Sequence, residues 1–198
     1  MNIDFVNSKS VESCSPLEKQ DKPFEGIANK DIIDDVEMKK SCIELVRNFY
    51  KEGLHIDFAE KGLHGRCEIA SSFYNEIKER MGIDAELSFV CKPPHVLGGY
   101  NHVTNKMELN SNYLEQPDCK DLLNTILHES RHAFQNKCIK DPGSVTVKNN
   151  IIDVWKDNFN NYISPQFDFE AYENQEIEKD ANYYADSIMK KGTYEYYS

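Results

Sequence analysis

Apolar residues recur every three or four positions along much of the chain, the spacing that collects them on one face of a helix. This pattern predicts helices over residues 31–50 and 66–81, each followed closely by a glycine. The same spacing returns in the second half and predicts helices over residues 118–138, 149–162 and 169–190. We therefore expect a mainly helical chain.

The spacing changes in the middle of the chain, where short apolar runs alternate with turn residues. ELSFVC, at residues 86–91, is typical of a strand and ends before two prolines. GGYNHVTNKMELN, at residues 98–110, predicts a hairpin or an edge strand with a turn at Thr-Asn-Lys. Together with the helices, these strands indicate an α+β fold in which a small, mostly antiparallel sheet packs against helices.

The first part of the chain differs from the rest. Residues 1–30 show no sustained apolar period and contain Pro16, Pro23 and Gly26 among many polar and charged residues. We expect a flexible arm there. Residues 31–198 have the length and the pattern of one domain.

Charge limits the partners of this chain. It carries 23 basic and 34 acidic side chains, a formal net charge of −11. We expect neither nucleic acid nor an anionic membrane as a partner, because both attract basic surfaces. No apolar run reaches the roughly 20 residues of a membrane helix, and no signal peptide is recognisable at residues 1–12. We therefore expect a cytoplasmic protein, or one exported by a route that needs no signal peptide.

The cysteines do not form a metal or redox motif. They stand at positions 14, 42, 67, 91, 119 and 138, too far apart for a CxxC-type site. Their density is low for a secreted domain held by disulfides, which favours reduced thiols.

The predicted helix over residues 118–138 contains HESRH at residues 128–132, an HExxH motif. Residues four apart lie one above the other on a helix, so His128 and His132 can both bind one Zn²⁺ ion. Glu129 is rotated by about 100° from His128 and can reach a water molecule on that ion. Chance alone gives about 0.02 such motifs in a chain of this composition. The motif therefore predicts a catalytic zinc site.

The helical projection allows two interpretations of this segment. Apolar residues fill one side of the helix, whereas His128 and His132 lie on the opposite, polar side. An ordinary amphipathic helix would expose both histidines to solvent. In a metal site, the polar side would form the floor of a cleft, and the motif favours this interpretation.

A catalytic zinc site needs a third protein ligand. No histidine follows in the spacing HExxHxxGxxH, so the metzincin arrangement is excluded and a carboxylate is expected. Glu178 lies at the margin of the apolar stripe of residues 169–190, whereas Glu176 and Asp180 are expected to face solvent. A carboxylate at that margin is costly unless it is paired or binds metal. We expect Glu178 to be the third zinc ligand, with Glu176 as the alternative. If Glu178 does not bind metal, its simpler role is a salt bridge at the margin of the helix.

Three segments resemble small bacterial zincins of the gluzincin type: GGYNHVTNKMELNSNYL, LLNTILHESRHAFQ and YENQEIEKDANYYA. They are most similar to metallopeptidase domains of polymorphic toxins and mobile elements, and the last is also similar to the ExxANxFA pattern of ImmA/IrrE regulatory peptidases. The resemblance covers residues 85–190. It implies a zincin-like fold with zinc bound by His128, His132 and Glu178. It also implies that Glu129 is the catalytic glutamate.

Other groups around the metal are less well specified. Tyr172 is the expected donor to the transition state, with Tyr162 and Tyr183 as alternatives. The stretch over residues 106–109 is expected to form an edge strand that pairs with an extended substrate. Four polar residues are candidates for orienting the histidines: Asp121, Thr125, Asn182 and Asp186.

These observations predict a zinc-dependent endopeptidase of the toxin or effector kind. It would hydrolyse a protein or peptide substrate with a metal-bound water activated by Glu129. A regulatory peptidase is the alternative within the enzyme class. In a different class, the chain is a non-catalytic or regulatory protein-binding module with a structural or vestigial zinc site. The presence of Glu129 counts against that class, because a structural site needs no base.

Overall fold

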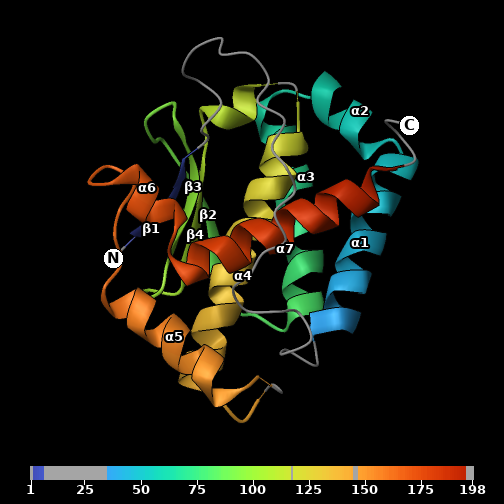
Figure 1. Ribbon diagram of the computed structural model, residues 1–198. Coiled ribbons are helices and arrows are strands. Elements are labelled where there is room, and N and C mark those ends of the chain that lie inside the picture. The colour runs from blue at the N-terminus through green and yellow to red at the C-terminus, as the bar shows by residue number, and fades with distance from the viewer. Residues whose placement is uncertain (1, 7–34, 117, 145–146, 195–198) are drawn as a thin grey trace, which may run out of the picture.

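Helices form most of the fold, and a small mixed sheet lies at one side of them (Figure 1). The computed structural model describes residues 2–6, 35–116, 118–144 and 147–194. The helices are α1 (Asp35–Lys51), α2 (Leu54–Glu60), α3 (Leu63–Met81), the 3₁₀ turn η3 (Tyr113–Glu115), α4 (Lys120–Lys140), α5 (Asn149–Asn160), α6 (Phe169–Glu173) and α7 (Glu176–Gly192). The strands are β1 (Asn2–Val6), β2 (Glu86–Val90), β3 (Val96–Asn101) and β4 (Lys106–Asn110). The predicted α+β class is confirmed.

Most of the predicted helices are present with small shifts at their ends. Those expected over residues 66–81, 118–138 and 149–162 correspond to α3, α4 and α5. The helix expected over residues 31–50 is α1 from Asp35 onward, and its first positions lie outside the described residues. α2 was not predicted, because its 7 residues are too few to show a helical period.

The prediction of a single helix over residues 169–190 is wrong, because this segment forms two helices, α6 and α7, with a short non-helical break between them. Gln175 adopts an extended backbone conformation at this break, with φ −65° and ψ 136°. Its side-chain oxygen accepts a hydrogen bond from the Ile163 N–H, and its side-chain nitrogen donates to the Ile163 carbonyl, both at 2.9 Å. This contact with the segment after α5 stabilises a break that the apolar spacing does not reveal.

The sheet has the strand order β1-β3-β4-β2. β3 and β4 form the predicted hairpin, and its turn contains Asn105 in the left-handed region with φ 55°. β2 pairs parallel with β4 and the other pairings are antiparallel, so the expected mostly antiparallel sheet is confirmed. The expectation that residues 106–109 form an edge strand is wrong, because both edges of β4 are paired, one with β2 and one with β3.

The flexible arm predicted over residues 1–30 is wrong for residues 2–6, which form β1. Asn2–Val6 pairs antiparallel with β3 and forms one edge of the described sheet. Without this strand, β3 would present a row of unpaired backbone donors and acceptors at its outer edge. Residues 7–30 lie outside the described residues, so the prediction stands untested there.

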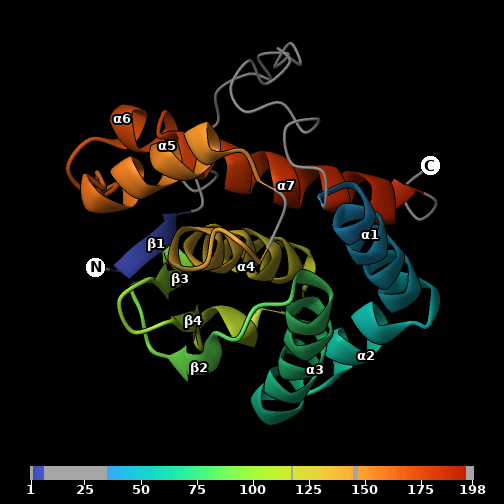
Figure 2. The same cartoon turned by 90° about the horizontal axis from the view of Figure 1, so that it is seen from below.

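α4 lies at the centre of the molecule, between the sheet and α7 (Figure 2). Every residue from 125 to 136 is buried, on the polar side as well as on the apolar side. The interpretation of α4 as an amphipathic helix with exposed histidines is therefore wrong. Gly98 contributes to this packing, because a Cβ atom there would lie only 2.9 Å from Cγ2 of Thr125. Glycine lets β3 approach α4 closely.

Two further expectations can be compared with the structure. The cysteines at positions 42, 67, 91, 119 and 138 are free thiols, as expected, and Cys14 lies outside the described residues. Among the helices that the structure describes, none combines the length and the apolar character needed to cross a membrane.

Candidate metal centre

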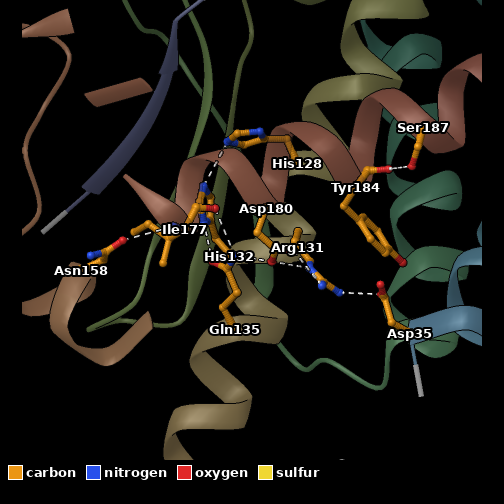
Figure 3. Close-up of polar contacts among 10 residues, drawn as sticks. All are labelled: Asp35, His128, Arg131, His132, Gln135, Asn158, Ile177, Asp180, Tyr184 and Ser187. Carbon is orange, nitrogen blue, oxygen red and sulfur yellow. Dashed lines mark hydrogen bonds and ion pairs between the residues drawn. The ribbon is translucent and has the colours of Figure 1, made fainter. Parts of the chain in front are cut away.

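The two histidines of the HExxH motif lie one turn apart on α4, and their side chains meet (Figure 3). Their Nε2 atoms are 3.0 Å apart, and their ring centroids are 4.7 Å apart with the planes at 80°. The apolar side of α4 packs into the core, with Leu123, Ile126 and Phe134 almost fully buried. This packing fixes the helix so that His128 and His132 face α7.

Glu178 approaches both histidines from the first turn of α7. Its Oε2 is 3.3 Å from Nε2 of His128, and its Oε1 is 3.5 Å from Nε2 of His132. Small residues on α7, such as Ala181 and Ala185, are fully buried and allow the close approach of this helix. Glu176 is partly exposed and pairs with Lys179 at 3.1 Å. Of the two candidate carboxylates, the structure therefore places Glu178 with the histidines.

The spacing of these three groups fits a tetrahedral zinc ion. Zinc bonds of about 2.0–2.1 Å at tetrahedral angles place neighbouring ligand atoms about 3.3 Å apart. The distances of 3.0, 3.3 and 3.5 Å lie close to this value. Two imidazoles and one carboxylate are also a ligand set found in catalytic zinc sites.

The three groups shift one another's pKa. Burial lowers the pKa of His128. Burial also disfavours the charged form of His132, but the Glu178 carboxylate outweighs this effect and raises the pKa of His132 to about 9. For Glu178, burial favours the neutral form, but His132 outweighs burial and holds the pKa of Glu178 well below its usual range. Without metal, the cluster thus holds an ionised Glu178 carboxylate beside a neutral His128 and a protonated His132. Zinc binding would displace the proton of His132, because a ligating imidazole must be neutral.

Gln135 fixes the orientation of His132. Its Oε1 lies 2.9 Å from Nδ1 of His132, while its Nε2 donates to the Ile177 carbonyl at 3.1 Å and to Asp180 at 2.7 Å. Because the amide nitrogen is used by these two acceptors, the amide oxygen must face His132 and accept its Nδ1 proton. Nε2 is then the nitrogen of His132 that is directed at Glu178 and able to bind metal.

Asp180 connects Gln135 to Arg131, a buried residue within the HExxH motif. Arg131 donates to both carboxylate oxygens of Asp180, at 2.8 and 3.0 Å, and to Asp35 at 2.8 Å. Asp180 is only 3% exposed, so the expectation that it faces solvent is wrong. Its burial depends on Arg131, a partner on another helix that a projection of α7 alone cannot include. A chain of contacts therefore runs from the candidate metal centre to the start of α1.

Asp186, one of the residues predicted to orient the histidines, acts on His128 through its charge. Thr125 donates to the backbone carbonyl of Asp121, while Asp186 is exposed and accepts from Asn124 at 3.4 Å. Asn182 is half-buried on α7. The sequence prediction missed Gln135, although it follows His132 by three residues on the same predicted helix. That spacing was the available signal.

Glu129 and one of the candidate tyrosines lie close to the ligands. Glu129 is fully buried, and its charge acts on both His132 and Tyr172. Burial, followed by the charge of Glu178, raises the pKa of Tyr172 well above its usual value. The Tyr162 ring lies 6.2 Å from that of Tyr172. Tyr183 lies elsewhere, partly exposed, with the ammonium of Lys39 4.3 Å from the centre of its ring.

The candidate centre is closed in this structure. His128, Glu129, His132 and Glu178 each have an exposed fraction of 0%. The ring of Phe159 on α5 lies 6.3 Å from that of His132, and Tyr172 on α6 is buried near Glu178. The prediction that the polar side of α4 floors an open cleft is therefore wrong for this conformation. Contact between these groups and solvent therefore requires a covering segment to move.

Comparison of the chain with protein-family models, with curated proteins and with solved structures finds no significant match. The chemistry of the site is therefore the guide to the function of this chain.

Proposed function

We propose that the chain is a zinc-dependent endopeptidase of the zincin kind, with His128, His132 and Glu178 as the zinc ligands. The observation that carries the proposal is the convergence of these three buried groups at the spacing of a tetrahedral site. The resemblance of residues 85–190 to gluzincins supports the same assignment. Bound zinc would supply Lewis acidity, polarise a scissile carbonyl and lower the pKa of water.

Glu129 is the proposed general base of the reaction. It follows His128 directly on α4, and its charge acts on His132. From this position it takes a proton from the attacking water and passes it to the leaving amine. Replacing it with glutamine removes the base and keeps the shape of the side chain.

Tyr172 is the proposed hydrogen-bond donor to the oxyanion. Its hydroxyl stays protonated because burial and the Glu178 charge raise its pKa. A protonated phenol can donate to the oxygen that becomes negative as the carbonyl is attacked. Tyr162 stands beside Tyr172 and is the second candidate for this role.

The proposed substrate is a protein or peptide, and the proposed role is that of a toxin or effector. The net charge of −11 favours such a partner over nucleic acid or an anionic membrane. One observation favours a second candidate function. The ligands are fully buried, and a structural zinc site in a non-catalytic binding module needs no access for a substrate.

Metal content tests the centre itself. Protein purified without a metal-affinity tag should contain about one zinc ion per chain, measured by elemental analysis. His132→Ala and Glu178→Ala should lose the zinc, whereas Glu176→Ala is the matched control and should keep it. Absence of zinc from the wild type after reconstitution, with the fold intact, would exclude the proposal.

Activity separates the two candidate functions. Glu129→Gln should keep the zinc and lose peptide-bond hydrolysis, measured with a library of quenched fluorescent peptides. Hydrolysis that persists in Glu129→Gln would show that Glu129 is not the base. A wild-type protein that binds zinc stoichiometrically, cleaves no peptide and needs the zinc only to fold would favour the structural site.

A further inference from the structure

β1 occupies the outer edge of β3 by backbone pairing. The two strands are antiparallel, and their register places Asn2 opposite Asn101 and Phe5 opposite Gly98. A bulge follows Phe5. An extended peptide of another sequence can take this register, because such pairing uses N–H and C=O groups that nearly every residue has.

β3 runs along the part of α4 that contains the histidines. At one end, Gly98 packs against Thr125, which precedes His128 by one turn. At the other end, Asn136 donates to the Tyr100 hydroxyl at 2.6 Å, one turn after the second histidine. The sheet edge at β3 therefore spans the length of the candidate metal centre.

A further contact brings the end of β3 towards the metal ligands. The ring of His102, directly after β3, lies 5.1 Å from that of Phe159, and the Phe159 ring lies 6.3 Å from that of His132. Figure 3 shows β1 on the same side of α4 as His132. A peptide paired to the outer edge of β3 would thus pass beside the centre.

We propose that the outer edge of β3 is the substrate-binding edge of the peptidase, and that β1 occupies this edge as an intramolecular ligand. This inference rests on the proposed function. It replaces β4 as the expected substrate-pairing strand, because both edges of β4 are paired.

The connection between β1 and α1 permits the exchange that this proposal requires. Residues 7–34 separate the two elements in the sequence. At up to about 3.5 Å per residue, a connection of this length can span well beyond the width of the domain. β1 can therefore leave the edge without displacing α1.

The test uses two ways of removing β1. One variant lacks residues 1–6. The other is the full chain with Ile3→Pro and Asp4→Pro, because consecutive residues alternate in facing the partner strand and one of the two prolines must remove a ladder hydrogen bond. The matched control, Ile3→Ala with Asp4→Ala, keeps both backbone N–H groups. Circular dichroism on every sample establishes that each variant is folded, and zinc content is measured separately on the same samples.

The probe is a fluorescent synthetic peptide with the sequence of residues 1–6, and its binding is measured by anisotropy. We expect it to bind the truncated and proline variants at least roughly tenfold more tightly than the wild type or the alanine control, because an attached strand competes at a high effective concentration. A peptide with proline at its third and fourth positions should not bind. Hydrogen exchange should show that the amides of β3 lose protection on truncation and regain it with the peptide.

Two outcomes would overturn the inference. A folded, zinc-containing truncated protein that does not bind the peptide would show that β3 is not a docking edge. Binding of the peptide by the wild type that is lost on truncation would show that peptides add to the outer edge of β1 instead. Failure of the proposed function gives a different result. If the truncated protein is folded and binds the peptide but contains no zinc, β3 is a docking edge and the chain is not a zinc peptidase.

Discussion

At the scale of single residues, the candidate centre depends on side chains that do not touch the metal position. Arg131 stands between the two histidines in the sequence, yet its guanidinium points away from them to Asp180 and Asp35. It is fully buried, and its charge is balanced by these two carboxylates. Arg131 therefore links α4 to α7 and to α1.

Arg131→Met should lower the free energy of unfolding by about 3–5 kcal/mol, because Asp180 and Asp35 would then be buried without their cation. Urea unfolding measures this change. Arg80→Met is the control, since Arg80 pairs with Glu76 at the protein surface, and it should cost less than about 1 kcal/mol. Equal effects of the two substitutions would contradict the assigned role of Arg131.

Gln135→Leu should weaken zinc binding by about 10- to 100-fold, because His132 would lose the acceptor that orients it. Competition with a chromophoric chelator measures the affinity. Asn136→Ala is the matched control on the next residue. Asn136 is also buried but donates to Tyr100 and to the His102 carbonyl, so this variant should keep the affinity of the wild type. A similar loss in both variants would indicate a general effect of destabilising α4.

At the scale of elements, the position of β3 against α4 decides how the sheet meets the candidate centre. Gly98 permits the contact, because any larger residue would place its Cβ 2.9 Å from the Thr125 methyl carbon and 3.0 Å from the Glu108 carbonyl. Gly98 thus allows β3 to pack closely against α4, the helix that contains both histidines.

Gly98→Ala should lower the free energy of unfolding by about 1–3 kcal/mol, because the added methyl group forces β3 away from α4. Gly143→Ala is the control, since its Cβ would meet no atom closer than Oδ1 of Asp141 at 3.8 Å and its φ is not positive. Thermal and urea unfolding of both variants give the comparison. Full stability of Gly98→Ala would show that the contact is looser than the structure indicates.

At the scale of the whole molecule, the candidate centre lies where α4 and α7 meet, in the interior of the fold (Figure 2). Bound zinc would link the two helices at Glu178, and the free energy of binding would add to the stability of the native state. Under the proposed function, the same burial requires an opening motion before a substrate can bind.

Removal of zinc should therefore lower the melting temperature of the whole domain. At a free zinc concentration about a thousandfold above the dissociation constant, binding contributes about 4 kcal/mol, which corresponds to about 10 °C for a domain of this size. Differential scanning calorimetry with and without a chelator measures the shift. His132→Ala should melt at the same temperature in both conditions, and a chelator effect in that variant would point to a different metal site.

The sequence by itself determined the local features of this protein. Apolar spacing located α3, α4 and α5, and the four-residue spacing of His128 and His132 implied that their side chains meet on one helix face. The margin of the apolar stripe distinguished Glu178 from Glu176 as the carboxylate near the histidines. These features depend on residues within a few positions of each other, and helix geometry alone relates them.

Only the tertiary structure decided which distant groups became partners. It buried Asp180 against Arg131, broke the last helix at Gln175, paired β1 with β3 and closed the candidate centre. The physical reason is that a buried charge needs a partner and a strand edge needs another strand, and either can come from anywhere in the chain. Periodicity along one segment carries no information about such partners, so they emerge only when the segments pack together.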